Sequence, residues 1–278
     1  MITTNGALQI KRYLGGSVGA IAQSIALGVG TAAESTGSTA MDFEVIRADI
    51  ILTSYDFVNN KLIFKATIPE NFVGTVYEAG LWSQSVDVSA GDYGSQTIAT
   101  FESDSETWVG GAFAATAARI GVEALQHTPA LSTSTTSSMS DIVYDLSGYS
   151  SADYFNFAYN VGNANTASIK FRFLTSAGNY YEFNIASPTA GYKVTKLTKG
   201  SATVTGSPTW SSITEVDVIT TSAAGGASAV SFDGIRLEDA DTTNTEYVLV
   251  ARELLGTPYA KVDTMAQDVE FSLNVTIT

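Results

Sequence analysis

Three short segments in the middle of the chain place an apolar residue at every second position. They are residues 154–159, 169–174 and 180–185. A period of two places successive side chains on opposite faces of a strand, so each segment is predicted to be a half-buried β-strand. Burying one phenylalanine contributes roughly 1.5–3 kcal/mol, so the apolar positions are expected to form a core. These positions are mostly aromatic: Phe155, Phe157, Tyr159, Phe171, Phe173, Tyr181 and Phe183.

The composition agrees with an all-β fold, and the net charge argues against nucleic acids and membranes as partners. The 278 residues are 45% hydrophobic and only 15% charged, which is typical of packed strands joined by short turns. The length suggests two domains, and the absence of cysteine excludes disulfides and thiolate metal sites. A formal net charge of −14 repels phosphate backbones and anionic lipid, so we expect no nucleic-acid binding and no membrane insertion.

The N-terminal region does not read as a secretory signal or a membrane span. Lys11 and Arg12 precede an apolar segment, but Gly15, Gly16 and Gly19 interrupt it. No run in the sequence approaches the roughly 20 apolar residues that cross a bilayer. We therefore expect a soluble protein made in the cytoplasm, with residues 1–16 as an arm that orders only against a partner.

A discontinuous scaffold domain is predicted from the two ends of the chain. Residues 68–82 indicate a strand end, a turn at Pro69 and a second strand, because proline cannot donate to a sheet ladder. After residue 96 the sequence pattern changes, and segments with the strand pattern of the scaffold occur again at 247–255 and 269–277. Because whole domains are most easily inserted at loop tips, we predict a scaffold of residues 1–96 and 241–278 with an insert of residues 97–240.

The scaffold segments resemble the N-terminal domain of phage tail-collar and tail-fibre proteins. The order and spacing of several pieces carry this resemblance: Gly28, Gly30 and Thr31, then Glu44 and Arg47, then residues 62–69 and the EAGLW run at 78–82. The resemblance implies that other virion proteins are partners. It also implies a homo-oligomer, with a trimer favoured, that is assembled in the host cytoplasm and exposed on the exterior of the virion.

The two ends of the insert resemble carbohydrate-binding modules with a galactose-binding-like jelly-roll fold, which implies a β-sandwich. The matches are Phe101, Glu102, Trp108, Gly121, Ala124 and Leu125, then Phe232, Asp233, Ile235 and Leu237. Members of that family often tie their first and last strands with Ca²⁺ at the positions of Glu102 and Asp233. Asp104 is added to this set because hard cations take carboxylate oxygens. The alternative is that these are ordinary surface carboxylates.

The polar positions of the three alternating segments form a predicted ligand face. Proteins hold sugars by stacking them on aromatic rings and by hydrogen bonds from amides and charged groups. If the segments are neighbours in one sheet, this face would bind a host-surface glycan. The alternatives are an ordinary solvated face or a face buried against another subunit. The six residues are Tyr154, Asn156, Lys170, Arg172, Tyr180 and Glu182.

No motif in the sequence points to catalysis. The single histidine, His127, precedes Thr128 and Pro129 in an expected loop and has no partner for a Ser-His-Asp arrangement. We therefore expect a non-enzymatic bacteriophage structural protein, of the tail-fibre, baseplate or head-fibre kind, that presents a glycan-binding sandwich. The alternatives are a capsid decoration protein without sugar binding and an accessory module of a glycan-degrading enzyme.

Overall fold

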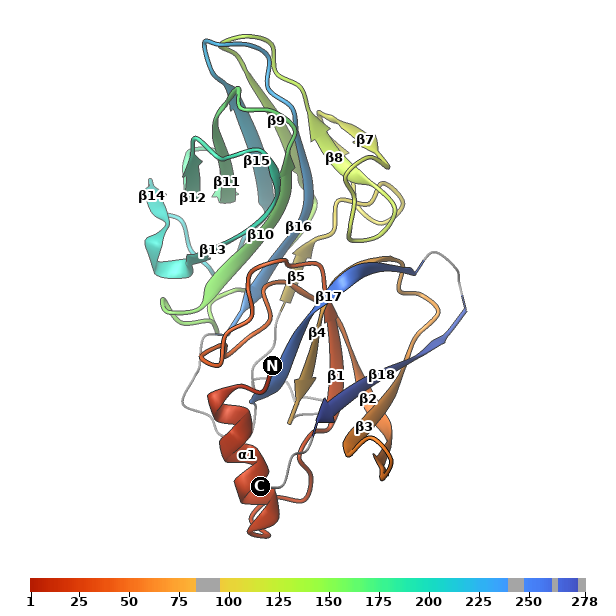
Figure 1. Ribbon diagram of the computed structural model, residues 1–278. Helices are drawn as coiled ribbons and strands as arrows, with labels where there is room; N and C mark the ends of the chain where they lie inside the picture. Colours follow the sequence, from red (N-terminus) through yellow and green to blue (C-terminus); the bar gives the residue numbers. More distant parts are fainter. Residues whose placement is uncertain (84–95, 240–247, 262–264, 275–278) are drawn as a thin grey trace. The chain divides into compact units, whose positions relative to one another are not determined.

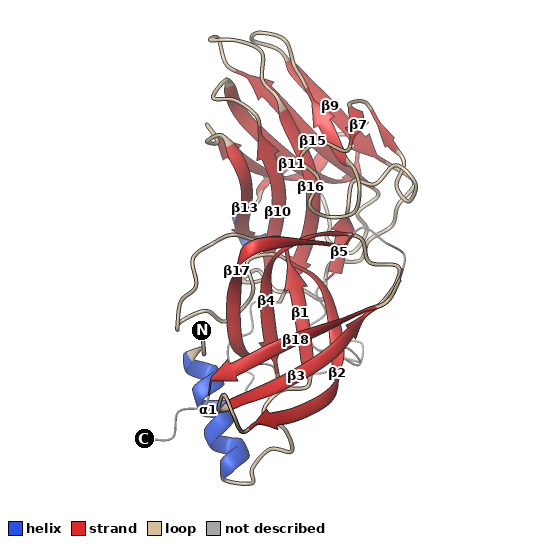
Figure 2. Cartoon of the chain, turned by 45° about the vertical axis from the view of Figure 1, so that its right-hand side comes forward, coloured by secondary structure: helices blue, strands red, loops and turns tan. Residues whose placement is uncertain are grey.

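The computed structural model describes residues 1–83, 96–239, 248–261 and 265–274. The chain divides into two compact units: unit 1 is Met1–Asp92 with Asp241–Thr278, and unit 2 is Tyr93–Ala240. Strands dominate both units, so the expected all-β class is confirmed (Figure 2). Within these ranges, no helix is long and apolar enough to cross a membrane.

Unit 1 is built on one six-stranded antiparallel sheet in the order β17-β4-β1-β2-β3-β18 (Figure 1). The two strands that follow the insert in sequence pair with strands that precede it: β17 with β4, and β18 with β3. The strand β2 is long enough to pair with β1 through its first half and with β3 through its second. The bounds are β1 (Ser24–Gly28), β2 (Glu44–Asp56), β3 (Lys61–Ile68), β4 (Gly74–Trp82), β17 (Leu249–Lys261) and β18 (Gln267–Asn274).

The helix α1 (Thr4–Leu14) forms from local signals and packs on β17. Thr3 is its N-cap, and the Thr3 hydroxyl accepts a hydrogen bond of 2.9 Å from the backbone N–H of Gly6. A Cβ atom at Gly6 would lie only 2.0 Å from the carbonyl oxygen of Val250, so glycine permits this close approach. The expectation that residues 1–16 order only against a partner was therefore wrong, because their own chain supplies the contact surface.

Unit 2 is a β-sandwich, as expected. One sheet, called here the β10 sheet, has the order β13-β10-β16-β8-β7, with β5 also paired to β16. The other, the β11 sheet, has the order β14-β12-β11-β15-β9-β6. The β10 sheet holds β5 (Gln96–Ala99), β7 (Ala112–Ala114), β8 (Ala124–His127), β10 (Tyr154–Val161), β13 (Gly191–Thr198) and β16 (Val230–Glu238). The β11 sheet holds β6 (Trp108–Val109), β9 (Ser134–Met139), β11 (Thr166–Ser176), β12 (Asn179–Ala186), β14 (Thr203–Thr205) and β15 (Glu215–Ser222).

Aromatic rings from the two sheets meet inside the sandwich. Phe157 of β10 stacks on Phe171 of β11 with ring centroids 4.0 Å apart, and Phe155 lies 4.6 Å from Phe173. All four side chains are fully buried. The alternating pattern therefore predicted the core face of these strands correctly.

The single histidine lies in this core and not in a loop. His127 ends β8 and is fully buried, with its Nε2 atom 2.7 Å from the Ser137 hydroxyl and its Nδ1 atom 3.1 Å from the Thr220 hydroxyl. Burial lowers the pKa of His127 to about 4, so the ring is neutral at physiological pH. It is a core residue with two hydrogen-bond partners, which accounts for it without a catalytic role.

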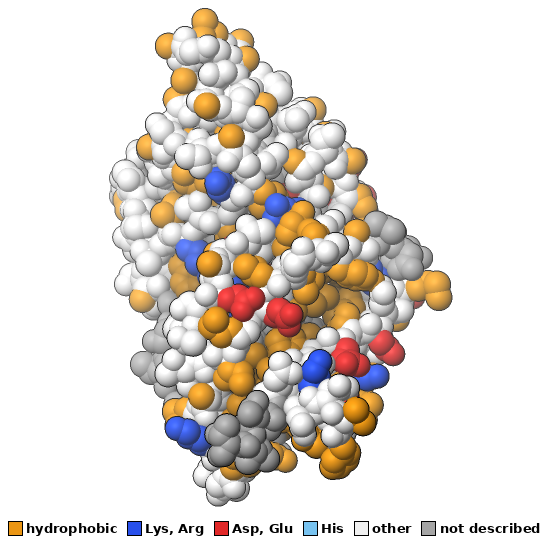
Figure 3. All heavy atoms as spheres, viewed as in Figure 1, with side chains coloured by type: hydrophobic (Ala, Val, Ile, Leu, Met, Phe, Trp, Pro, Cys, Tyr) orange, Lys and Arg blue, Asp and Glu red, His pale blue; other side chains and the backbone are white. Residues whose placement is uncertain are grey.

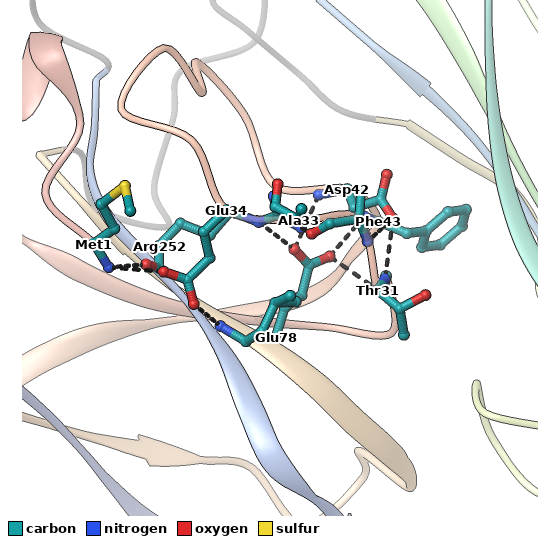
Figure 4. A network of polar contacts seen from close by, with 11 residues as sticks. Met1, Thr31, Ala33, Glu34, Asp42, Phe43, Glu78 and Arg252 are labelled. Atoms are coloured by element: carbon teal, nitrogen blue, oxygen red, sulfur yellow. Dashed lines mark hydrogen bonds and ion pairs between the residues drawn. The ribbon is translucent and has the colours of Figure 1, made fainter.

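The buried carboxylate of Glu78 in β4 connects the loop between β1 and β2 to β17 (Figure 4). It accepts hydrogen bonds from the backbone N–H groups of Gly30, Asp42 and Phe43 at 3.2, 3.0 and 2.7 Å. It also accepts one of 2.7 Å from Nε of Arg252, and both charged side chains are almost completely buried. The Arg252 guanidinium then donates to the carbonyl groups of residues 32 and 33 at 3.0 and 3.4 Å.

Six of the residues that carry the tail-collar resemblance lie in two clusters, one around Glu78 and one around Trp82. A Cβ atom at Gly28 or Gly30 would lie 2.6 Å from a Glu78 oxygen, so the two glycines leave room for that carboxylate. Glu44 and Arg47 form a two-pronged ion pair at 2.8 and 2.7 Å, and the Arg47 guanidinium lies 4.2 Å from the ring centroid of Trp82. The motif thus has a structural explanation within unit 1.

We expect Gly28→Ala to destabilise unit 1 by roughly 1–3 kcal/mol, because a new methyl group there overpacks a site without free space. Its Cβ atom would lie 2.4 Å from the Phe43 carbonyl oxygen as well as against Glu78. Scanning calorimetry of the whole chain would measure the loss. The matched control is Gly256→Ala on β17, whose Cβ atom would meet nothing within 4 Å. Equal melting curves for the two variants would contradict this account of the glycine.

Candidate functional site

The structure separates the six predicted ligand-face residues into two groups. Tyr154 and Asn156 lie on β10, which pairs with β13 and β16. The other four lie on β11 and β12, which pair with each other in the opposite sheet. The prediction that the three segments are neighbours in one sheet was therefore wrong. Since both sheets turn their aromatic positions toward the core, their polar positions face in opposite directions.

The two residues on β10 do not form a ligand face with the others. Asn156 is fully buried. Tyr154 is half-buried, and the Lys196 ammonium group lies 5.0 Å from its ring centroid. Neither side chain is brought near Lys170, Arg172, Tyr180 or Glu182, since the sandwich core lies between the two faces.

A line of polar residues crosses the outer face of the β11 sheet and includes two of the predicted residues. The register places Arg172 directly opposite Glu182 on one side and opposite Asp217 on the other. The line continues from Glu182 to Thr203 of β14 and from Asp217 to Ser138 of β9. We call these five residues the polar row. It spans five neighbouring strands, so it offers an extended surface that no single strand could provide.

Glu182 is the centre of charge in this face. One of its oxygens accepts a hydrogen bond of 2.8 Å from the Lys170 ammonium, and the other accepts one of 2.6 Å from Nε of Arg172. Burial alone would raise the pKa of Glu182, but the hydrogen bonds and positive charges of Lys170 and Arg172 outweigh it and lower that pKa. The three side chains therefore hold one another in place in their charged forms.

Tyr180 places an aromatic ring beside the polar row. It lies two positions from Glu182 on β12, and the Arg172 guanidinium carbon is 4.6 Å from its ring centroid. Tyr180, Arg172 and Lys170 are all partly exposed, and the side chains of the latter two keep 27% and 31% of their surface accessible. The face thus combines a ring, a fixed carboxylate and fixed cations within reach of solvent.

The sequence prediction missed four residues of this face, namely Ser138, Thr203, Glu215 and Asp217. Ser138 donates a hydrogen bond of 2.6 Å to Asp217. Glu215 lies two residues before Asp217, and its pKa is raised by burial and by the charge and hydrogen bond of Asp217. The signal was present, because residues 215–218 alternate between two acidic side chains and two buried valines.

Two of the three predicted calcium ligands lie together. The carboxylates of Glu102 and Asp233 both accept hydrogen bonds from backbone N–H groups of the loop at residues 119–123. Glu102 accepts from the N–H groups of Val122 and Glu123 at 3.1 Å. Asp233 accepts from those of Arg119 and Ile120 at 3.0 and 3.2 Å and from the Tyr192 hydroxyl.

The third candidate, Asp104, is exposed, and the described part of the chain contains no group of three or more His, Cys, Asp and Glu side chains that could hold a metal. Burial raises the pKa of Glu102 and raises that of Asp233 to about 7, with the charge of Glu102 adding to the latter shift. The buried carboxylate of Asp233 and the half-buried carboxylate of Glu102 repel each other, and a bound cation would compensate their charge. They leave most of its oxygen ligands to backbone groups or water, so calcium stays a prediction.

No model of a known protein family matches the chain, and no curated protein matches it in sequence. Among solved structures, the family 30 carbohydrate-binding module of a cellulosomal cellulase of Clostridium thermocellum is 17% identical, with a TM-score of 0.37, over 54% of this chain and 91% of that chain. The family 11 module of another cellulosomal cellulase of that organism is 12% identical, with a TM-score of 0.35, over 56% and 91%. An exo-β-agarase is 12% identical, with a TM-score of 0.40, over 54% of this chain and 26% of that one.

The matched region therefore spans nearly all of the binding modules but only about a quarter of the agarase. Likenesses at these scores assign no ligand and no activity to this chain. The evidence for its function has to come from its own side chains.

The calcium prediction can be tested by chelation. A cation between Glu102 and Asp233 would stabilise the native state in which both carboxylates are ionised. A ligand that binds the native state alone raises the free energy of unfolding by about 2.7 kcal/mol at a hundredfold excess over the dissociation constant. A chelator should therefore lower the melting temperature of the calcium-loaded chain at pH 7. The double variant Glu102→Gln, Asp233→Asn should melt at the same temperature with and without chelator. If the chelator leaves the melting temperature of the wild-type protein unchanged, the calcium prediction is wrong.

Proposed function

We propose that this chain is a non-catalytic glycan-binding protein whose ligand lies along the polar row of the β11 sheet. The observation that carries the proposal is the fixed group of Glu182, Arg172 and Tyr180, in which a carboxylate, a guanidinium and an aromatic ring share one solvent-exposed face. The apolar face of a sugar ring stacks on an aromatic side chain, and its hydroxyl groups pair with charged and polar groups.

The arrangement is suited to binding because its side chains are already ordered. The carboxylate of Glu182 is held by two ion pairs, and the Arg172 guanidinium is held between that carboxylate and the Tyr180 ring. Immobilising a long side chain costs affinity when it happens on binding. Here the contacts within the protein have met most of that cost before a ligand arrives.

The same geometry does not suit glycoside hydrolysis. That reaction uses two carboxyl groups on either side of the bond to be cleaved, roughly 5–9.5 Å apart. Glu215 and Asp217 instead lie two residues apart on the same strand, and Glu182 is ion-paired with both Lys170 and Arg172. These contacts support a binding role for this face.

We further propose that unit 1 attaches the chain to a bacteriophage particle, together with other virion proteins and as a homo-oligomer, with a trimer favoured. The support is the resemblance of its Gly28-to-Trp82 segments to tail-collar domains, whose shared residues build the Glu78 and Trp82 clusters. A cryo-electron microscopy map of the assembled particle, with this chain traced in it, is the test. Absence of the chain from purified particles would end the virion proposal while leaving glycan binding open.

Tyr180→Ala and Arg172→Ala should each weaken glycan binding about tenfold, equivalent to about 1.4 kcal/mol, since each removes one element of the fixed group. Binding is measured on a glycan array and by adsorption to host cells. Both residues are partly exposed, so the melting temperature should change little.

The matched control is Tyr154→Ala, which removes a tyrosine from the opposite sheet and should leave glycan binding unchanged. Loss of binding in Tyr154→Ala alone would move the ligand to the β10 sheet. Unchanged binding in all three variants would contradict the polar row as the site.

A further inference from the structure

We infer that the polar row selects uncharged saccharides and discriminates against uronates, sialylated sugars and sulfated sugars. This inference rests on the proposed function, because it concerns the ligand class of the same face. It follows from how the charged groups of the face are already paired within the protein.

The cations of the face are engaged by the protein itself. Lys170 and Arg172 each bind a different oxygen of Glu182, at 2.8 and 2.6 Å. The register also places Arg172 opposite Asp217 on its other side, so the guanidinium lies between two carboxyl-bearing strands. An acidic ligand could bind either cation strongly only by displacing a carboxylate that is part of the protein. Hydrogen bonds between such cations and a carboxylate are among the strong ones, and here they are already made within the protein.

Negative charge already crowds the other half of the face. Asp217 is 7% exposed and uses one oxygen to accept the Ser138 hydroxyl. Glu215 stands next to it with a raised pKa, caused by burial and then by the charge and hydrogen bond of Asp217. A further anion here would meet like charges, and the formal net charge of −14 adds long-range repulsion. Two cations thus face three carboxyl groups.

What the face offers instead is suited to hydroxyl groups. The Glu182 oxygens can accept hydrogen bonds from a sugar, and the exposed Thr203 hydroxyl can donate or accept. The Ser138 hydroxyl, which donates its hydrogen to Asp217, can accept one. Tyr180 supplies an aromatic surface at the edge of the row. Neutral hexoses carry donors and acceptors in such numbers and bring no charge to be compensated. The chemistry of the face therefore points to an uncharged polyhydroxylated ligand.

The test uses the whole chain on a glycan array that carries neutral hexosyl, uronate, sialylated and sulfated oligosaccharides. Wild-type protein should bind neutral oligosaccharides at least about tenfold better than acidic ones of the same length. Glu182→Gln keeps the shape of the side chain but frees Lys170 and Arg172. It should therefore gain about tenfold for acidic oligosaccharides, and added salt should reverse that gain. The matched control is Glu253→Gln on β17, an exposed residue of unit 1, which should leave both preferences unchanged.

The outcomes separate the two proposals. Wild-type preference for acidic sugars, or no acidic gain in a folded Glu182→Gln variant, would overturn the inferred selectivity and leave glycan binding standing. Absence of binding to every oligosaccharide on the array would overturn the proposed function, and the inference would fall with it. Melting curves of both variants confirm that the proteins compared are folded.

Discussion

Unit 1 depends on one buried ion pair, that of Glu78 and Arg252. The two residues are separated by 174 positions in sequence and meet at 2.7 Å with 0% and 4% of their side-chain surfaces exposed. A buried ion pair is stable only if hydrogen bonds satisfy both partners, because desolvation costs several kcal/mol per ion. Here three backbone N–H groups complete the carboxylate and two carbonyl groups complete the guanidinium. Gly28, Gly30, the loop between β1 and β2, and β17 are all arranged to meet that requirement.

The fold of unit 2 depends on a different constraint, which is the burial of many aromatic rings. Because rings from β10 and β11 stack on each other in the interior, each sheet turns a polar face outward. On the β11 sheet the outward residues of neighbouring strands coincide in register, which produces the polar row. On the face shown in Figure 3, charged side chains are few, in keeping with the low charged fraction of the sequence.

Local patterns predicted the strands and their buried sides, but they could not predict which strands share a sheet. Alternation assigned Phe155 and Phe171 to the core, while the pairing of β10 with β16 joins residues that are 69 to 84 positions apart in sequence. The same limit misplaced His127, whose partner Thr220 lies 93 residues along the chain. Asp217 was within reach of the pattern and was missed because its segment contains no aromatic residue. The tail-collar and calcium interpretations remain predictions, since they rest on resemblance.

The pairing of β5 with β16 has a consequence for how the chain is completed during synthesis. Ser83 and Val248, which are hydrogen-bonded neighbours in unit 1, stand 165 residues apart, so β4 leaves the ribosome long before its partner β17. Unit 2 is continuous in sequence and contains all its own strands. Its folding brings Gln96 opposite Leu237, the two places where the chain enters and leaves it. Once unit 2 has folded, the ends of the insert lie next to each other, so the effective loop between β4 and β17 is much shorter than the sequence separation. Since each doubling of loop length costs about 0.6 kcal/mol in closure entropy, a folded insert assists its scaffold and does not burden it.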